Sequence, residues 1–152
     1  MEKLKVYTAE MATSHLDETR IINQMEVTVA TKKIPFAGTD ARVYADFGTL
    51  GKYFLNAAGE DDFEMGTIKT YNFQTSFRLG DLRKTVIELG HDNSGKNPGW
   101  CVGGFRLQIK LQDSDILYLY KLWEDIGWLS KDKAPFYAVV AELQEGVSKK
   151  LD

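Results

Sequence analysis

The stretch Phe105-Arg106-Leu107-Gln108-Ile109-Lys110-Leu111 decides the fold class of this 152-residue chain. Apolar side chains occupy every odd position of the stretch, and polar side chains occupy every even position. Successive side chains of an extended strand point to opposite faces. The alternation therefore predicts a β-strand with one face in the core and the other in water.

Other segments follow the same pattern, and few segments hold the period of about 3.6 that marks a helix. Glycine-containing breaks separate them, as in a sandwich of short strands. We therefore predict an all-β chain that forms a two-sheet antiparallel β-sandwich. The further predicted strands are 25–29, 42–47, 71–73, 85–89 and 136–143; 3–8 fits a strand, 16–23 a short helix, and 116–122 either.

Length and composition narrow the function classes. A chain of 152 residues with 43% hydrophobic residues is expected to form one domain. The formal charge of −3 argues against a general nucleic-acid binder. The start of the chain has no signal-peptide apolar core, and no apolar run is long enough to span a bilayer, so a cytoplasmic location is the default expectation. Peripheral membrane attachment and secretion after removal of a signal stay open. The single Cys101 excludes an internal disulfide and is expected to be a buried thiol.

The segment from Gly90 to Lys96 fits the pattern G-x-x-x-x-G-K of a phosphate-binding loop. That loop requires a following Ser or Thr and a helix whose N-terminus meets the phosphate. Here Asn97 follows, and Pro98-Gly99 cannot open a helix. The segment is therefore predicted to be a polar loop, with no nucleotide among the expected ligands.

Four segments occur in a fixed order along the chain. They are 27–31 with Phe36-Ala37-Gly38-Thr39-Asp40-Ala41; Asp61-Asp62-Phe63-Glu64-Met65-Gly66; Leu79-Gly80-Asp81-Leu82 with Gly90–Gly95 and Pro98-Gly99-Trp100; and Gly127-Trp128-Leu129. Together they resemble the PLAT domain, the lipoxygenase-homology β-sandwich, whose N-D-F-E-R-G motif is similar to the second segment. The resemblance implies a PLAT-type sandwich of about eight strands over residues 25–129. Residues 1–24 would be an N-terminal extension, and residues 130–152 a C-terminal extension with one added strand and a tail.

The loop around Ala37-Gly38-Thr39-Asp40 has two interpretations. It is either a tight connection, in which Gly38 supplies an unusual backbone angle and Asp40 caps the turn, or a calcium loop. The resemblance implies calcium, bound by the backbone carbonyls of Phe36 and Gly38 together with Asp40.

The loop that follows His91 is the expected partner of this calcium loop. Asp92 and Asn93 offer side-chain oxygens to the same ion, although a cluster of Asx turns explains the composition equally well. The segment 59–64 is acidic. In some lipoxygenase members the corresponding segment contributes a second calcium site, which would fall on Asp61 and Glu64 here. Ala41 stands where the more acidic members carry an additional acid.

The segment Lys32-Lys33-Ile34-Pro35-Phe36 lies beside the first candidate site. An apolar tip flanked by lysines suits contact with an anionic membrane, with Lys32, Lys33, Ile34 and Phe36 as the binding residues. Alternatively, the loop folds back and Phe36 plugs the end of the sandwich. Membrane-binding members of the family often carry tryptophan where this chain has Pro35.

Nothing in the sequence indicates an enzyme. The chain has no G-x-S-x-G nucleophile motif, and its two histidines, His15 and His91, have no spaced metal-ligand partner. We expect a non-catalytic binding module, with calcium as its candidate cofactor, that associates with another protein or with an anionic membrane surface. The alternatives are a calcium-assisted peripheral lipid binder that serves a separate lipid-acting enzyme, and a purely structural subunit.

Overall fold

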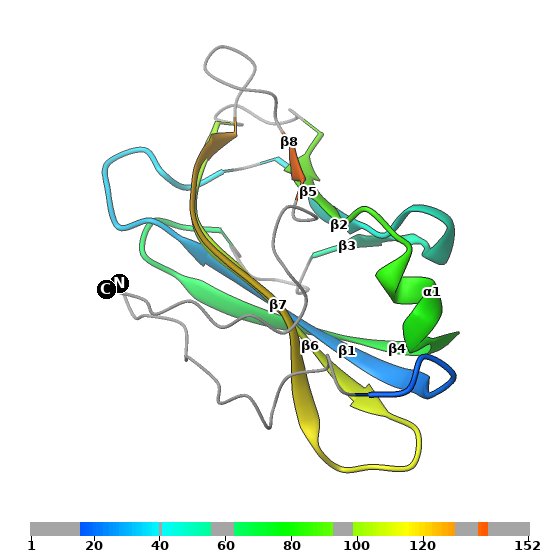
Figure 1. The fold of residues 1–152 in the computed structure, drawn as a ribbon. Coiled ribbons are helices and arrows are strands. Elements are labelled where there is room, and N and C mark those ends of the chain that lie inside the picture. Colours follow the sequence, from blue (N-terminus) through cyan, green and yellow to red (C-terminus); the bar gives the residue numbers. More distant parts are fainter. Residues whose placement is uncertain (1–15, 40, 56–62, 93–98, 130–136, 140–152) are drawn as a thin grey trace.

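The computed structural model describes residues 16–39, 41–55, 63–92, 99–129 and 137–139, and for 123–125 and 137–139 the backbone alone (Figure 1). Within these residues it contains eight strands and two short helices. The strands are β1 (Ile21–Thr31), β2 (Val43–Asp46), β3 (Lys52–Phe54), β4 (Ile68–Arg78), β5 (Glu88–His91), β6 (Trp100–Leu111), β7 (Leu117–Leu129) and β8 (Tyr137–Val139); the helices are the 3-10 turn η2 (Gly48–Leu50) and α1 (Leu79–Arg83).

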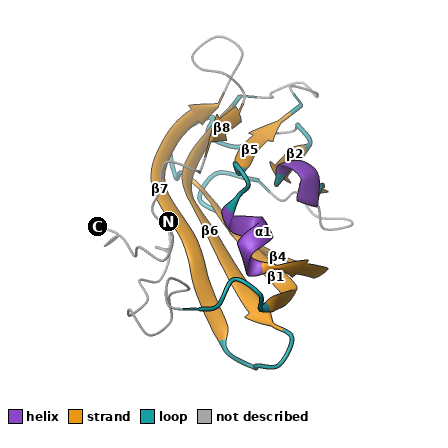
Figure 2. Cartoon of the chain, turned by 45° about the vertical axis from the view of Figure 1, so that its right-hand side comes forward, coloured by secondary structure: helices purple, strands orange, loops and turns teal. Residues whose placement is uncertain are grey.

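The strands form two four-stranded sheets, with the orders β4-β1-β6-β7 and β3-β2-β5-β8. All the pairings in both sheets are antiparallel. The first sheet is long and strongly curved, the second is short, and α1 lies at one side of the sandwich (Figures 1 and 2). The structure confirms the predicted two-sheet antiparallel sandwich.

The core lies between the sheets and follows the alternation of β6. Phe105, Leu107 and Ile109 are all fully buried and belong to the main hydrophobic cluster. The opposite face of β6 is not uniformly wet, however, because Gln108 is only 3% exposed. The expectation that every polar position of this strand faces water was therefore wrong.

A second cluster on the outer face of the long sheet explains this burial. Gln108 pairs with Leu119 of β7, and Arg106 pairs with Leu122. Both leucines are fully buried and form a cluster of their own, against which Ile68 packs. Gln108 thus pairs with a residue of a buried apolar cluster, and its own burial follows from that position.

Several element predictions at the ends of the strands change. The helix expected over 16–23 is wrong, because β1 begins at Ile21 and Ile22 is fully buried between the neighbouring strands. Before it, the carboxylate of Asp17 accepts hydrogen bonds from the backbone and hydroxyl of Thr19 and makes a turn. The segment 116–122, which fitted either class, is strand and belongs to β7.

The segment 85–89 is only partly strand. The hydroxyl of Thr85 donates to the carbonyl of Leu82 at 2.7 Å and so closes the end of α1, and β5 begins three residues later at Glu88. The predicted strand 3–8 lies outside the described residues, and only 137–139 of the predicted strand 136–143 are described, as β8.

Candidate functional site

Three chain connections lie at one end of the sandwich, next to the end of β1 and the start of β6. We call this region the loop end. The three connections are the loop 32–39 (light blue at the upper left of Figure 1), the connection 63–67, and the end of β5 at His91 with Asp92 after it. The backbone N–H of Lys32 donates to the carbonyl of Cys101 at 3.0 Å, and the N–H of Cys101 donates to the carbonyl of Ala37 at 2.9 Å. Both ends of the loop 32–37 are therefore fixed to β6.

Buried aromatic side chains pack beside these connections. The indole Nε1 of Trp100 donates to the hydroxyl of Thr31 at 2.9 Å, and both side chains are fully buried. The ring of Phe63 packs against that of Trp100 with 5.2 Å between centroids. Trp100 and Cys101 are buried, as predicted. The end of β1 and the connection 63–67 thus both adjoin Trp100 at the start of β6.

The loop 32–39 is joined directly to the connection 63–67. The N–H of Thr39 donates to the carbonyl of Phe63 at 3.1 Å, and the N–H of Gly66 donates to the carbonyl of Lys32 at 3.2 Å. A Cβ at Gly38 would lie only 2.7 Å from the carbonyl oxygen of Phe63. A glycine is required at this position because the two backbones pass so close to each other.

This corrects the reason given for Gly38 in the turn interpretation. The glycines with a positive φ are Gly48, Gly51, Gly66 and Gly127 among the described residues, and Gly38 is not one of them. The left-handed conformation in this loop falls instead on Phe36, with φ of 64°.

A β-turn over 34–37 places Phe36 at the tip of the loop. The N–H of Ala37 donates to the carbonyl of Ile34 at 3.2 Å, with Pro35 and Phe36 as the two central residues. Proline first and positive φ second is the arrangement of a type II turn. Phe36 is 91% exposed and Ile34 is 39% exposed, so Phe36 does not plug the end of the sandwich.

The candidate ligand Asp92 lies where β5 leaves the short sheet. Its Oδ1 accepts the N–H of Arg42 at 3.1 Å, and its own N–H donates to the carbonyl of Arg42 at 3.0 Å. Asp92 therefore lies beside the chain that enters β2. Of the other predicted calcium ligands, Asp40, Asn93 and Asp61 lie outside the described residues.

The described residues supply only part of a calcium site. Among them, no group of three or more His, Cys, Asp or Glu side chains is close enough to hold a metal ion. Asp92 offers one carboxylate, and hydrogen bonds with Arg42 fix its backbone. Glu64 is exposed, and its carbonyl accepts the N–H and hydroxyl of Thr67. The carboxylate of Asp92 and the backbone carbonyls of Phe36 and Gly38 are oxygen ligands of the kind that calcium takes, whereas Asp40 and Asn93 lie outside the described residues.

His91 is a structural residue at this end of the sandwich. It is fully buried, and its Nε2 lies 2.8 Å from the carbonyl oxygen of Leu129, so it links β5 to the end of β7. Burial lowers the pKa of His91, and the bond to Leu129 and the charge of Asp92 oppose the shift. The folded state therefore favours a neutral imidazole.

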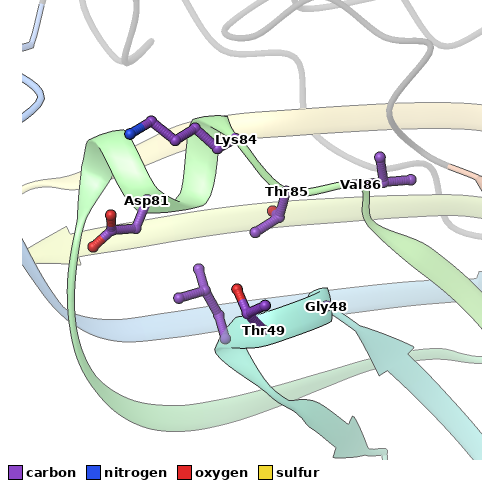
Figure 3. Close-up of a pocket in the computed structure, with 7 residues that line it drawn as sticks. Gly48, Thr49, Asp81, Lys84, Thr85 and Val86 are labelled. Atoms are coloured by element: carbon purple, nitrogen blue, oxygen red, sulfur yellow. The ribbon is translucent and has the colours of Figure 1, made fainter.

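A cavity of about 310 Å³ lies at the other end of β2, between η2 and α1 (Figure 3). Its lining residues include the apolar Leu50 and Val86 and the charged Asp81 and Lys84. The hydroxyl of Thr85 is already bonded to Leu82. No convergent set of polar groups selects a ligand in this cavity, and it lies apart from the three converging connections.

Sequence reasoning missed two residues at the loop end. Met65 is 49% exposed in the connection 63–67, and Arg42 adjoins Asp92 while its guanidinium lies 4.2 Å from the centre of the Phe54 ring. A signal for Met65 was present, because it stands where the family motif has arginine.

The family model of the PLAT/LH2 domain matches residues 25–125, and the chain belongs to this family. PLAT/LH2 domains are modules that associate with lipids or with proteins. Over 82 residues, half of this chain, it is 43% identical to human lipoxygenase homology domain-containing protein 1 and 42% identical to the mouse protein of that name. The chain covers only 4% of the length of these relatives.

Solved structures share the fold. Coral 8R-lipoxygenase, described as activated by calcium through a C2-like domain, superposes with a TM-score of 0.52 at 28% identity, over 77% of this chain and 16% of the lipoxygenase chain. The alpha toxin of Clostridium absonum gives a TM-score of 0.63 at 17% identity, over 84% of this chain and 33% of the toxin chain, which shows a shared fold alone. In the part of this chain that is described, no helix is long and apolar enough to cross a membrane.

Proposed function

We propose that this PLAT/LH2 domain is a non-catalytic module that attaches reversibly to anionic membrane surfaces through its loop end, with calcium as the assisting ion. The observation that carries the proposal is the conformation of Phe36. Its side chain is 91% exposed at the tip of a turn whose two ends are fixed to β6.

Two costs are combined at Phe36. A left-handed backbone in a bulky residue costs about 1–3 kcal/mol, and such strain gathers at functional positions. A phenyl ring left in water also forgoes about 1.5–3 kcal/mol of burial free energy. Hydrogen bonds at Lys32 and Ala37 fix the loop, so the free protein keeps both the backbone strain and the exposed ring. Entry of the ring into a lipid surface would gain the burial free energy.

The lysines beside the tip supply the electrostatic part of the attachment. Lys33 is exposed and Lys32 is half-buried. Each contributes about 1 kcal/mol near an anionic surface. Together with burial of one phenyl ring, this gives weak, reversible and salt-sensitive attachment.

Calcium would complete the site by neutralising the carboxylates that share this end. The proposed ligands are Asp40, Asp92, Asn93 and the carbonyls of Phe36 and Gly38. Asp92 already lies beside the chain entering β2, and the coral lipoxygenase of the same fold is described as calcium-activated through its C2-like domain. Bound calcium would bridge these oxygens to anionic headgroups. Asp61 and Glu64 are the proposed ligands of a second ion.

Cosedimentation with anionic phospholipid vesicles tests the proposal. The wild type should pellet at low ionic strength with calcium, and high salt should weaken the binding. Phe36→Asn should remove binding without lowering the melting temperature, since asparagine accepts a positive φ. A loss of stability of several kcal/mol in Phe36→Asn would mean that the ring packs in the core. Absence of the wild type from the pellet would leave association with a protein as the function to pursue.

A further inference from the structure

The loop end exposes apolar side chains from two different connections. In the loop 32–39 they are Ile34 and Phe36, which are 39% and 91% exposed. In the connection 63–67 it is Met65, which is 49% exposed. A flexible thioether side chain adapts its shape to an irregular or fluid apolar environment.

The two connections are held together on both sides of Met65. The Cα of Glu64 and the backbone nitrogen of Met65 would each lie 3.2 Å from a Cβ on Gly38. On the other side, a Cβ on Gly66 would lie 3.3 Å from Cγ of Lys33. The backbone just before Met65 thus lies close to Gly38, and Gly66 just after it lies close to the side chain of Lys33.

Hydrogen bonds fix the same arrangement. The bond from Gly66 to the carbonyl of Lys32 lies on one side of Met65, and the bond from Thr39 to the carbonyl of Phe63 lies on the other. The spacing between Met65 and the turn 34–37 is therefore set by the backbone. The second connection cannot swing away from the tip without breaking both bonds.

We infer that Met65 is the second-loop anchor of a two-loop apolar tip, formed with Ile34 and Phe36, that enters the lipid surface. This inference rests on the proposed function and adds a residue and a second loop to it. The stem of Lys33 packs along Gly66, next to Met65 in the chain, and long charged side chains of this kind keep the ammonium group in water. Glu64 adjoins Met65 in the same connection and Asp92 follows β5, and the proposed calcium would neutralise these two carboxylates.

Charge and apolar contact give the tip a distinct salt response. Contacts of the lysines with headgroups weaken as salt rises, whereas burial of a thioether does not. The loss of binding in Met65→Gln should therefore be the same factor at low and at moderate salt. The loss in Lys33→Gln should shrink as salt is added.

The test compares matched variants on vesicles of anionic and zwitterionic phospholipids. Met65→Gln keeps the length of the side chain and removes its apolar character, so it should weaken binding about ten-fold. Met65→Leu should bind like the wild type. The control is Ile116→Gln, because Ile116 is 47% exposed in the turn between β6 and β7 at the opposite end of the long sheet. This control should also bind like the wild type.

The possible failures are distinguishable. If the wild type binds, Phe36→Asn does not, and Met65→Gln and Ile116→Gln both bind like the wild type, the role of Met65 is overturned while the proposed function stands. If Met65→Gln and Ile116→Gln weaken binding equally, the tip is not the site of contact. If the wild type does not bind any vesicle, the proposed function itself fails.

Discussion

Replacement of Gly38 by alanine tests whether the loop 32–39 and the connection 63–67 are as close as the structure shows. The added Cβ would stand 2.7 Å from the carbonyl oxygen of Phe63 and 3.2 Å from the backbone at Glu64 and Met65. These neighbours are backbone atoms, so no side-chain rotation relieves the overlap. The two connections must move apart, and the bond from Thr39 to Phe63 lengthens.

The expected loss follows from two opposing terms. Overpacking of this kind costs about 1–3 kcal/mol. Reduced freedom of the unfolded chain returns about 0.4–1 kcal/mol on a change from glycine to alanine. Gly38→Ala should therefore lower the free energy of unfolding by about 1–2 kcal/mol, or the melting temperature by about 2–8 °C for a chain of this size.

Urea unfolding followed by far-ultraviolet circular dichroism measures this loss. Gly48→Asn is the control, because no atom lies within 4 Å of a Cβ at Gly48 and asparagine accepts its φ of 62°. The control should change stability little. A Gly38→Ala variant as stable as the wild type, or more stable, would refute the close approach of the two loops and with it the two-loop tip.

Two further predictions concern His91 and calcium. Because burial lowers the pKa of His91 below its usual 6.5, the unfolded state takes up a proton before the folded state does, and the free energy of unfolding should fall as pH drops below about 6.5. His91→Gln should make the free energy of unfolding less dependent on pH between about pH 7.5 and 5.5. The same dependence in the variant and the wild type would contradict the buried neutral imidazole. Asp17 and Asp113, with pKa values held below 3.8 by hydrogen bonds to Thr19 and Arg20, do not titrate in that window. Calcium at a hundred-fold excess over its Kd should stabilise the wild type by about 2.7 kcal/mol in thermal melts. Asp92→Asn keeps an acceptor for the N–H of Arg42 and should lose this stabilisation. Equal stabilisation of both proteins would show that Asp92 is not a calcium ligand.

The sandwich could be predicted because its determinants are local. Alternation in β6 identified Phe105, Leu107 and Ile109 as core residues, and all three are fully buried. The burial of Gln108 could not be predicted in the same way. It depends on Leu119 and Leu122 in β7, so it becomes visible only when the two strands are in register.

The candidate site shows the same division between local and long-range information. The sequence pointed to the segment Lys32–Phe36 and to Gly38. It did not show that Phe36, not Gly38, has the positive φ, or that Gly38 is required by the backbone of Phe63. The departure of Met65 from the arginine of the family motif marked that residue, but its place beside the loop 32–39 depends on contact between two loops far apart in the chain, which leaves no periodic pattern.

Attachment through the loop end is tested by the binding of the wild type and Phe36→Asn to anionic vesicles, with calcium and with chelator. We expect the wild type to pellet with the vesicles in calcium and chelator or high salt to release it, whereas Phe36→Asn should stay in solution with an unchanged melting temperature. Equal pelleting of the two proteins, or no pelleting of either in calcium at low salt, would contradict attachment through this loop end.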